Sequence, residues 1–332
     1  MGEEDRMKTV VFLKDLDELK EALLEFNIEE FSGKTVPLKL HMGEVKNRYY
    51  PRPSTIKMVV DELKSFNVKP FLFDTTVAYH SLRHSRKGYE KVAALHGFTK
   101  IGCEVVIDDK GVPVEVAGRV YEVAEHIYNA THIVAFTHVK GHIAVGMGGA
   151  IKNFGMGGVT KETKQRMHHN SRPVFREEKC TKCGVCAEVC PFNAIKVEED
   201  RWLYNIKSCF GCGVCVENCR YAALAYRDLD LQYALACAAK ACLDGKQVIY
   251  ISELKRIARS CDCDPSAGPI ICRDIGFLVS DDPVAVDQAS LDLIYEVEPD
   301  VFKKLNHVDS VKQIRFGEEL GLGSSRYSLK EL

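Results

Sequence analysis

Apolar and polar residues alternate along the first part of the chain with two different periods. Short apolar runs with a period of two predict strands, and apolar residues three or four positions apart predict helices. The predicted strands are 8–13, 35–40, 70–74, 104–107 and 132–138, and the predicted helices are 16–26, 54–66, 88–96 and 119–129. Because strands alternate with helices, the sequence predicts an α/β fold with a doubly wound, mostly parallel sheet.

This pattern stops near residue 140 and resumes after residue 226. Residues 140–158 contain seven glycines, more than we expect of a strand or a helix, and residues 160–176 are polar and basic. Beyond residue 226 the predicted helices are 230–244, 283–297 and 311–319, and the predicted strands are 247–251 and 276–279. Two strands are few for an independent sheet. We therefore expect one discontinuous α/β domain, 1–174 plus 227–332, with a small domain inserted at 175–226. Separate N- and C-terminal domains are the alternative.

Composition and charge narrow the class of protein. The 332 residues are 46% hydrophobic and 28% charged, with a formal net charge of −2. This balance is typical of a globular protein and gives no sign of a nucleic-acid or membrane partner. No apolar run reaches the length of about 18 residues that a transmembrane helix needs. The first six residues are acidic and lack an apolar core, so we expect no signal peptide and a cytoplasmic location.

The cysteines are unusually clustered. The chain has 14 of them, and without a secretion signal such clustering indicates metal ligands or catalytic groups rather than disulfides. Two runs share the spacing Cys-x2-Cys-x2-Cys-x3-Cys. The first contains Cys180, Cys183, Cys186 and Cys190, followed by Pro191, and the second contains Cys209, Cys212, Cys215 and Cys219.

This spacing is typical of bacterial ferredoxins with two clusters, in which the fourth cysteine of each run binds the other cluster. The sequence therefore predicts a ferredoxin-like α+β insertion with two 4Fe-4S clusters. One cluster would be held by Cys180, Cys183, Cys186 and Cys219, and the other by Cys209, Cys212, Cys215 and Cys190. Two zinc sites are the alternative, but zinc ligands usually come as cysteine pairs. One departure from the ferredoxin pattern is that Arg220, not proline, follows Cys219.

The remaining cysteines are less informative. Cys103, Cys237 and Cys242 lie in apolar stretches, and we expect them in the core. Cys261 and Cys263, with Cys272 nearby, leave two interpretations open. They bind a metal, or they belong to a cysteine-rich loop near the clusters.

Lysine and histidine recur where predicted strands end. One strand leads into Lys39 and His41, and another leads into Lys140 and His142. A third ends at Asp74, and the glycine-rich stretch leads to Lys152 and Asn153. Open α/β sheets bind ligands beyond the carboxyl ends of their strands, so these residues predict a shared pocket for an anionic substrate. Each one taken alone is also compatible with a solvated surface position.

Taken together, these motifs resemble the family known as domain of unknown function 362. The resemblance rests on Lys39, Lys140-Gly-His142, the glycine-rich run into Lys152 and Asn153, His168, Cys261-Asp-Cys263-Asp264, and residues 274–276 and 280–287. Many members carry a two-cluster ferredoxin domain inserted at this place. The resemblance spans nearly the whole chain and implies an α/β fold with iron–sulfur clusters. It implies no substrate, because the chemistry of the family is largely undefined.

These features lead to a functional hypothesis. The clusters relay electrons from a redox partner protein, or from a small-molecule donor, to an anionic substrate or cofactor at the strand ends. A histidine with a near-neutral pKa transfers the accompanying proton, and Asp74 or Asp287 orients it, although Asp287 fits a helix face better. The alternative is a non-catalytic electron carrier or a metal or cluster assembly factor. A carrier leaves most of the chain unexplained, whereas the oxidoreductase lacks a dinucleotide-binding fingerprint, since Gly146-x-Gly148-Gly149 has the wrong spacing.

Overall fold

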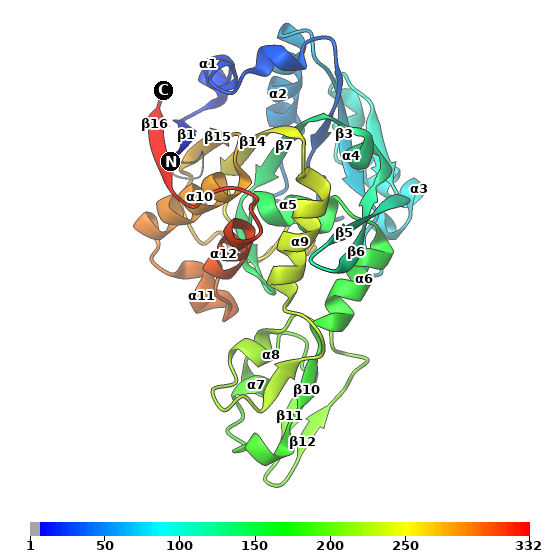
Figure 1. Ribbon diagram of the computed structural model, residues 1–332, viewed down its shortest axis with the longest axis vertical. Helices are drawn as coiled ribbons and strands as arrows, with labels where there is room; N and C mark the ends of the chain where they lie inside the picture. Colours follow the sequence, from blue (N-terminus) through cyan, green and yellow to red (C-terminus); the bar gives the residue numbers. More distant parts are fainter. Residues whose placement is uncertain (1–6) are drawn as a thin grey trace.

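A single twisted sheet forms the centre of the computed structural model, which describes residues 7–332; the acidic start lies outside them (Figure 1). The sheet has eight strands in the order β16-β1-β15-β14-β7-β2-β3-β4. Their bounds are β1 (Lys8–Leu13), β2 (Thr35–Lys39), β3 (Lys69–Thr75), β4 (Val105–Asp108), β7 (His132–His138), β14 (Gln247–Leu254), β15 (Gly276–Ser280) and β16 (Tyr327–Glu331). Only β15 runs antiparallel to its neighbours. The predicted doubly wound, mostly parallel sheet is confirmed.

Both faces of the sheet are covered by helices. Along β7, Ile133 and Ala135 pack into one hydrophobic cluster, and Val134 and Phe136 pack into another on the opposite face. One face carries α4 (Glu125–Asn129), α5 (Ala150–Gly157), α6 (Lys161–Asn170), α9 (Leu231–Leu243), α10 (Pro283–Val297), α11 (Val301–Asn306) and α12 (Val311–Glu319). The other carries α1 (Leu19–Leu24), α2 (Pro53–Ser65) and α3 (Arg86–Leu95). Short 3₁₀ helices add η2 (Leu16–Glu18), η3 (Ile28–Phe31), η4 (Leu82–His84), η5 (Phe98–Lys100) and η6 (Glu177–Lys179).

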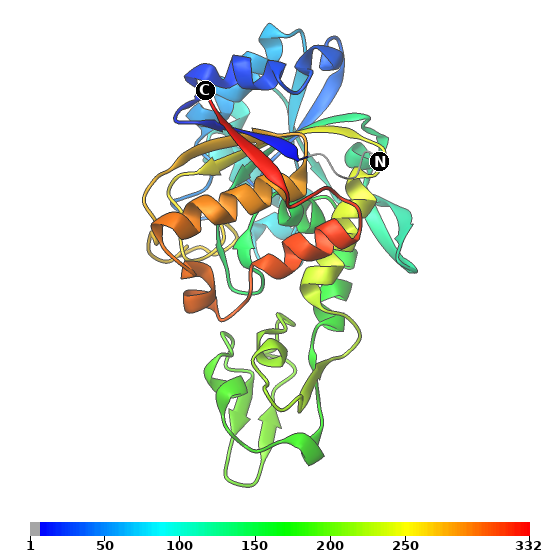
Figure 2. The ribbon, with the colours of Figure 1, turned by 60° about the vertical axis from the view of Figure 1, so that its left-hand side comes forward.

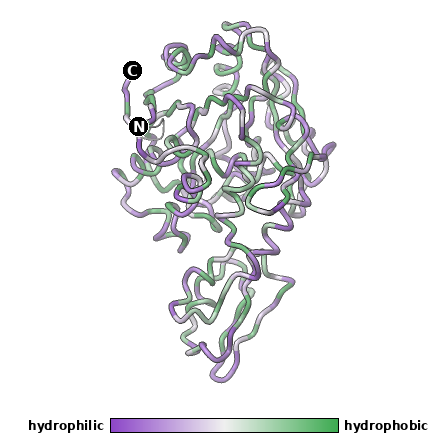
Figure 3. The backbone as a smooth tube through the Cα atoms, in the orientation of Figure 1, coloured by the Kyte–Doolittle hydropathy of each residue, from purple (hydrophilic) through white to green (hydrophobic). Residues whose placement is uncertain are grey.

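Residues 173–226, the cysteine lobe, extend from one end of the α/β body (Figures 1 and 2). The lobe contains two short antiparallel ladders and two short helices. These are β10 (Pro173–Phe175) with β13 (Leu224–Tyr226), β11 (Ile195–Val197) with β12 (Trp202–Tyr204), α7 (Val185–Glu188) and α8 (Val214–Glu217). The end of the lobe furthest from the sheet is hydrophilic (Figure 3). Strands from before and after the lobe share the central sheet.

Two segments differ from the expectations. The predicted helix 119–129 is wrong in its first half, because β5 (Gly111–Val116) and β6 (Arg119–Ala124) form a hairpin and only α4 is helical. A tight turn at 117–118, with Ala117 at φ 50°, reverses the chain there.

The glycine-rich stretch is the second difference, since it forms a β-hairpin and a helix. The hairpin consists of β8 (Lys140–His142) and β9 (Gly146–Gly148), and α5 follows it. The glycines allow close packing: a Cβ on Gly155 would lie 2.4 Å from the carbonyl oxygen of Leu235 in α9. The two helices therefore approach each other more closely than larger residues would permit.

No helix within residues 7–332 has the length and the apolar character needed to cross a membrane.

The predicted domain division can be tested by removing the cysteine lobe. Pro173 pairs with Tyr226 and Phe175 with Leu224, so the two ends of the lobe are about 5 Å apart. A short flexible linker in place of 175–226 should therefore leave a folded α/β domain with cooperative thermal unfolding and the helical circular dichroism of the full chain. Non-cooperative unfolding of the shortened chain would mean that the lobe and the α/β body share one folding unit.

Candidate functional site

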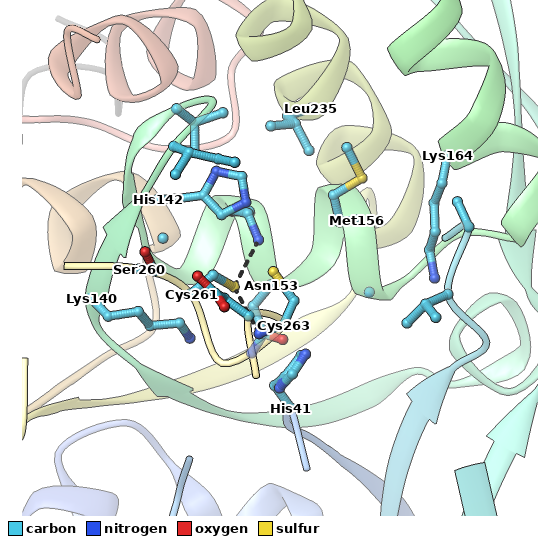
Figure 4. Close-up of a pocket in the computed structure, with 18 of the residues that line it drawn as sticks. His41, Lys140, His142, Asn153, Met156, Lys164, Leu235, Ser260, Cys261 and Cys263 are labelled. Carbon is cyan, nitrogen blue, oxygen red and sulfur yellow. Dashed lines mark hydrogen bonds between the residues drawn. The ribbon is translucent and has the colours of Figure 1, made fainter. Parts of the chain in front are cut away.

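The predicted site residues lie together at the carboxyl ends of the parallel strands. Lys39 ends β2, and Asp74 lies near the end of β3, beside it in the sheet. Lys140 and His142 lie on β8, directly beyond β7, and Lys152 and Asn153 lie on α5. These elements enclose a cavity of about 610 Å³ (Figure 4). All six residues predicted for the α/β site line it, namely Lys39, His41, Lys140, His142, Lys152 and Asn153. Their catalytic role stays a prediction.

Lys39 is buried at the centre of a polar network. Its Nζ donates to Asp74 Oδ1 at 3.0 Å and to Asn153 Oδ1 at 2.8 Å. The Asn153 amide in turn donates to the Phe136 carbonyl oxygen at 3.2 Å. Burial lowers the pKa of Lys39, while Asp74 opposes that shift. The network fixes β2, β3 and α5 against one another at the floor of the cavity.

Lys140 is held by a carboxylate from a distant loop. Its Nζ lies 3.0 Å from Asp262 Oδ2, and it also donates to the His138 carbonyl oxygen at 2.5 Å. Asp262 lies 3.0 Å from His138 Nδ1 as well. Although burial opposes it, the neighbouring His138 and Lys140 side chains hold the pKa of Asp262 far below its ordinary value. The loop that carries Cys261 and Cys263 is thereby tied to the end of β7.

Sequence reasoning missed Arg83, which organises the side of the cavity around His41. Arg83 is fully buried, and its Nε donates to Glu44 Oε2 at 3.1 Å. Its Nη1 lies 2.8 Å from His41 Nε2, and Tyr79 is a further partner. An isolated arginine in η4 carries no sequence signal, because its partners Glu44 and His41 come from the loop that follows β2.

Three histidines of the cavity, His41, His142 and His168, do not have the near-neutral pKa that we expected for proton transfer. Burial first, and then nearby cations, hold the pKa of His41 and His142 well below the usual value. Burial lowers the pKa of His168 to about 4.

Lys164 lines the cavity and titrates near neutral pH. Burial lowers its pKa to about 7, and its Nζ donates to Thr75 Oγ1 and to the Thr76 carbonyl oxygen, both at 2.6 Å. Lys164 lines the same cavity as Lys39 and Lys152. The sequence pattern did not single it out, because it lies in the polar, basic stretch that carries many charges.

Asp287 does not line the cavity and instead binds the start of α5. It is buried on α10 and accepts hydrogen bonds from the backbone N–H groups of Ala150 at 2.6 Å and Ile151 at 3.0 Å. These are the first amides of α5, so Asp287 caps the helix that carries Lys152 and Asn153.

The other cysteines divide between the core and the cavity. Cys237 and Cys242 are buried in the core, as predicted, and Cys103 is half-buried against it. Cys261 and Cys263 line the cavity, and their sulfurs lie within 4.8 Å of each other and of a nitrogen of His142. Cys272 is buried in the core cluster and does not join them.

The cysteine lobe contains two small cavities, each lined by four cysteines. The first quartet consists of Cys180, Cys183, Cys186 and Cys219. The second quartet consists of Cys190, Cys209, Cys212 and Cys215. Each quartet thus combines three cysteines of one run with the last cysteine of the other run. This is the crossed grouping that the ferredoxin spacing predicts.

Hydrogen-bond donors surround the cysteine sulfurs. The backbone N–H of Lys182 donates to Cys180 Sγ at 3.4 Å, and that of Ala194 donates to Cys190 Sγ at 3.3 Å. Burial raises the pKa of Cys186, and the neighbouring Trp202 side chain opposes that shift. N–H groups aimed at sulfur stabilise thiolates, so the surroundings of both quartets fit iron–sulfur clusters.

Aromatic side chains connect the second quartet to the central cavity. Phe192 and Phe210 line both cavities, and their ring centroids are 5.1 Å apart. His168 packs against Phe210 at 4.2 Å. A Cβ on the neighbouring Gly211 would lie only 1.9 Å from the His168 carbonyl oxygen. The lobe is therefore docked tightly against α6 where the second quartet meets the cavity.

The fold and the site define an α/β protein with a polar cavity at the carboxyl edge of its sheet and a cysteine-rich lobe beside that cavity. Residues 36–292 match the family described as domain of unknown function DUF362. The match spans more than half of the chain, so the protein belongs to this family, as the sequence motifs indicate.

Other similarities are partial. A segment of 31 residues is 55% identical to the pyruvate synthase subunit PorD of Methanosarcina barkeri (strain Fusaro / DSM 804), covering 9% of this chain and 33% of that protein. The lactate racemase apoprotein from Thermoanaerobacterium thermosaccharolyticum aligns with a TM-score of 0.43 and 12% identity, over 90% of this chain and 59% of that one. A Thermotoga maritima protein aligns with a TM-score of 0.38 and 8% identity, over 71% of this chain and 50% of that one.

The titration of Lys164 predicts how anion binding depends on pH. The charged groups acting on Lys164 are Asp74, which raises its pKa, and Lys39, Arg83 and Lys152, which lower it. Lys164 is cationic below about pH 7 and neutral above it. An anion in the cavity should therefore bind more weakly as the pH rises through 7, and its binding should take up a proton.

Sulfate is a suitable probe because its charge is constant over this range. Its dissociation constant, measured by calorimetry, should rise about tenfold between pH 6 and pH 8. Lys164→Met should bind sulfate weakly at both pH values, whereas Lys87→Met, on the surface of α3, should behave like the unaltered protein. A sulfate affinity that is independent of pH in the unaltered protein would contradict the prediction.

Proposed function

We propose that this protein is an iron–sulfur oxidoreductase that holds two 4Fe-4S clusters in its cysteine lobe and reduces an anionic substrate or cofactor bound in the central cavity. The clusters supply one-electron transfer. The similarity of 31 residues to a pyruvate synthase subunit supports the redox assignment in a general way. The type of cluster, the class of substrate and the use of an external electron donor are all parts of what we propose.

The observation that carries this proposal is the shared wall of Phe192 and Phe210. These two side chains separate the second quartet from a cavity large enough for a small molecule. A carrier that only exchanges electrons with other proteins has no need of such a cavity beside one of its clusters. Phe192 and Phe210 give a short path from the second quartet to a molecule bound in the cavity.

The lining of the cavity indicates the class of substrate. Lys152 and Lys164 have no carboxylate within ion-pair distance among the described residues, so both are available to an anion in the cavity. Met156 and Leu235 lie across the cavity from His41 (Figure 4). We infer that the substrate has an anionic end, held by lysines, and an apolar body that faces Met156, Leu235 and the phenylalanine wall.

Lys164 is suited to handle the proton that accompanies reduction. Its pKa of about 7 matches the range in which a general acid is most effective, and it faces the cavity between β3 and α6. His142, with a pKa well below the usual value, acts instead as a neutral hydrogen-bonding group. This assignment replaces the histidine acid expected from the sequence.

Cluster content and crossed ligation test the redox assignment. Anaerobically purified protein should contain about eight irons and eight acid-labile sulfides per chain, from two four-iron clusters. Cys190→Ser should alter the cluster held by Cys209, Cys212 and Cys215 and leave the other cluster unchanged in site-resolved paramagnetic resonance. Cys237→Ser, in the buried core, is the matched control and should alter neither. Two zinc ions per chain without iron or sulfide would refute the assignment.

Reoxidation kinetics separate an oxidoreductase from a carrier. After anaerobic reduction, the protein should be reoxidised by a small-molecule fraction of a cell extract. The absorbance of the clusters reports the rate of this reoxidation. Lys152→Met should slow this reoxidation at least about tenfold because it removes a cation from the cavity. Lys57→Met, on the exposed surface of α2, is the control. Equal rates in both variants, or reoxidation by proteins alone, would favour the carrier or the assembly factor.

A further inference from the structure

Three metal-binding side chains meet in the wall of the central cavity, apart from both cysteine quartets. Cys261, Cys263 and His142 each offer one donor atom, and these atoms all lie within 4.8 Å of one another. The three side chains point toward a common space in Figure 4. Two sulfurs and one imidazole nitrogen at this spacing match the donor set of a tetrahedral metal site with one position vacant.

The loop that carries the two cysteines is held in place from several sides. The side chain of Asp262, between them, is 3.0 Å from Lys140 Nζ, and its backbone carbonyl accepts the N–H of Glu44 at 2.9 Å. Asn47 Nδ2 donates to the Asp264 carbonyl oxygen at 2.7 Å. The positions of the sulfurs are thus fixed by surrounding contacts and do not depend on a bound ion. Such preorganisation by outer contacts is a general feature of metal sites.

The local backbone resembles that of the first quartet. The N–H of Cys263 donates to Cys261 Sγ at 3.4 Å, and the N–H of Lys182 donates to Cys180 Sγ at the same distance. In both loops the amide two residues further along stabilises the sulfur. Asp262 is engaged with Lys140 and His138, so it offers no oxygen ligand. The remaining donors are sulfur and nitrogen, which favour thiophilic ions over magnesium or calcium.

His142 and Lys152 complete the arrangement. The backbone N–H of Ala144 donates to His142 Nδ1 at 3.1 Å, which leaves Nε2 as the nitrogen available to a metal. Ligation through Nε2 moves the ring proton to Nδ1 and gives up that one hydrogen bond. Lys152 Nζ lies 3.8 Å from Cys261 Sγ. Ligation of a divalent cation by both sulfurs as thiolates would displace the proton that the pair holds, and the charge of the cation would release Lys152 to an anion in the cavity.

We propose that Cys261, Cys263 and His142 bind one thiophilic divalent metal ion, with a fourth coordination position open to the central cavity. Zinc and cobalt(II) fit this donor set, and the open position is the feature that distinguishes catalytic from structural sites of this kind. An oxygen of a molecule bound beside Lys140 and Lys152 would have access to that position. The site uses no cysteine of either quartet and is independent of the proposed redox function.

Cobalt(II) is the probe of choice, because its X-ray absorption edge is separate from that of cluster iron. Full-length protein, purified anaerobically with its iron retained, should bind one cobalt per chain with two sulfur neighbours at about 2.3 Å and at least one nitrogen. A double variant, Cys261→Ser with Cys263→Ser, should lose this binding. His142→Gln should weaken it at least about tenfold. Cys272→Ser, in the buried core, is the matched control and should bind one cobalt like the unaltered protein.

Three outcomes would overturn the proposal. These are equal cobalt binding by the double variant and the unaltered protein, a coordination shell without sulfur, or a Cys261–Cys263 disulfide whose reduction restores no binding. The last outcome would indicate a redox-active cysteine pair instead. Iron content and thermal unfolding of every variant separate loss of the site from loss of the fold. Protein without iron that still binds cobalt at these residues would refute the redox function and leave the metal site standing.

Discussion

Three buried ion pairs at the carboxyl edge of the sheet hold together the segments that form the cavity. The pairs are Lys39 with Asp74, Lys140 with Asp262, and Arg83 with Glu44. A buried charge without a partner is strongly destabilising, so each cation can stay in the interior only if a carboxylate reaches it. The carboxylates come from β3 and from the loops near residues 44 and 262. The charge pairing thereby fixes where these segments lie against the strand ends.

The same requirement underlies the anion binding that we propose for the cavity. Lys152 and Lys164 face the cavity but have no carboxylate within ion-pair distance in the part of the chain that the structure describes. Lys164 lowers the cost of its burial by giving up its proton near pH 7. Lys152 remains beside Cys261. The anionic ligand that we propose would supply a countercharge for these two lysines, so its binding would lower the electrostatic cost of burying them.

Local sequence patterns predict the sheet and half of the cavity well. Lys39 and Lys140 follow directly from apolar strands, so the rule that parallel strands share a carboxyl edge is enough to bring them together. Arg83 and Asp262 could not be found in this way. Their partners are 39 and 124 residues away along the chain, and no periodicity encodes such contacts. The prediction for the glycine-rich stretch was wrong because many glycines were taken to exclude a strand or a helix. In the structure they allow close packing of a hairpin and a helix, as at Gly155.

The two quartets differ in their surroundings, because one is open to solvent and the other lies next to the central cavity. Cys183 of the first quartet is exposed, whereas Cys215 of the second is buried. The second quartet also lies behind the phenylalanine wall of the cavity. In the proposed function, an external donor would have its easiest access at the first quartet, and a molecule in the cavity would lie nearest to the second. The chain also links the two quartets, because Cys186 in α7 is followed by Cys190 of the second quartet and Cys215 in α8 is followed by Cys219 of the first. Phe210 and His168, in contact with each other, connect the second quartet to the edge of the cavity.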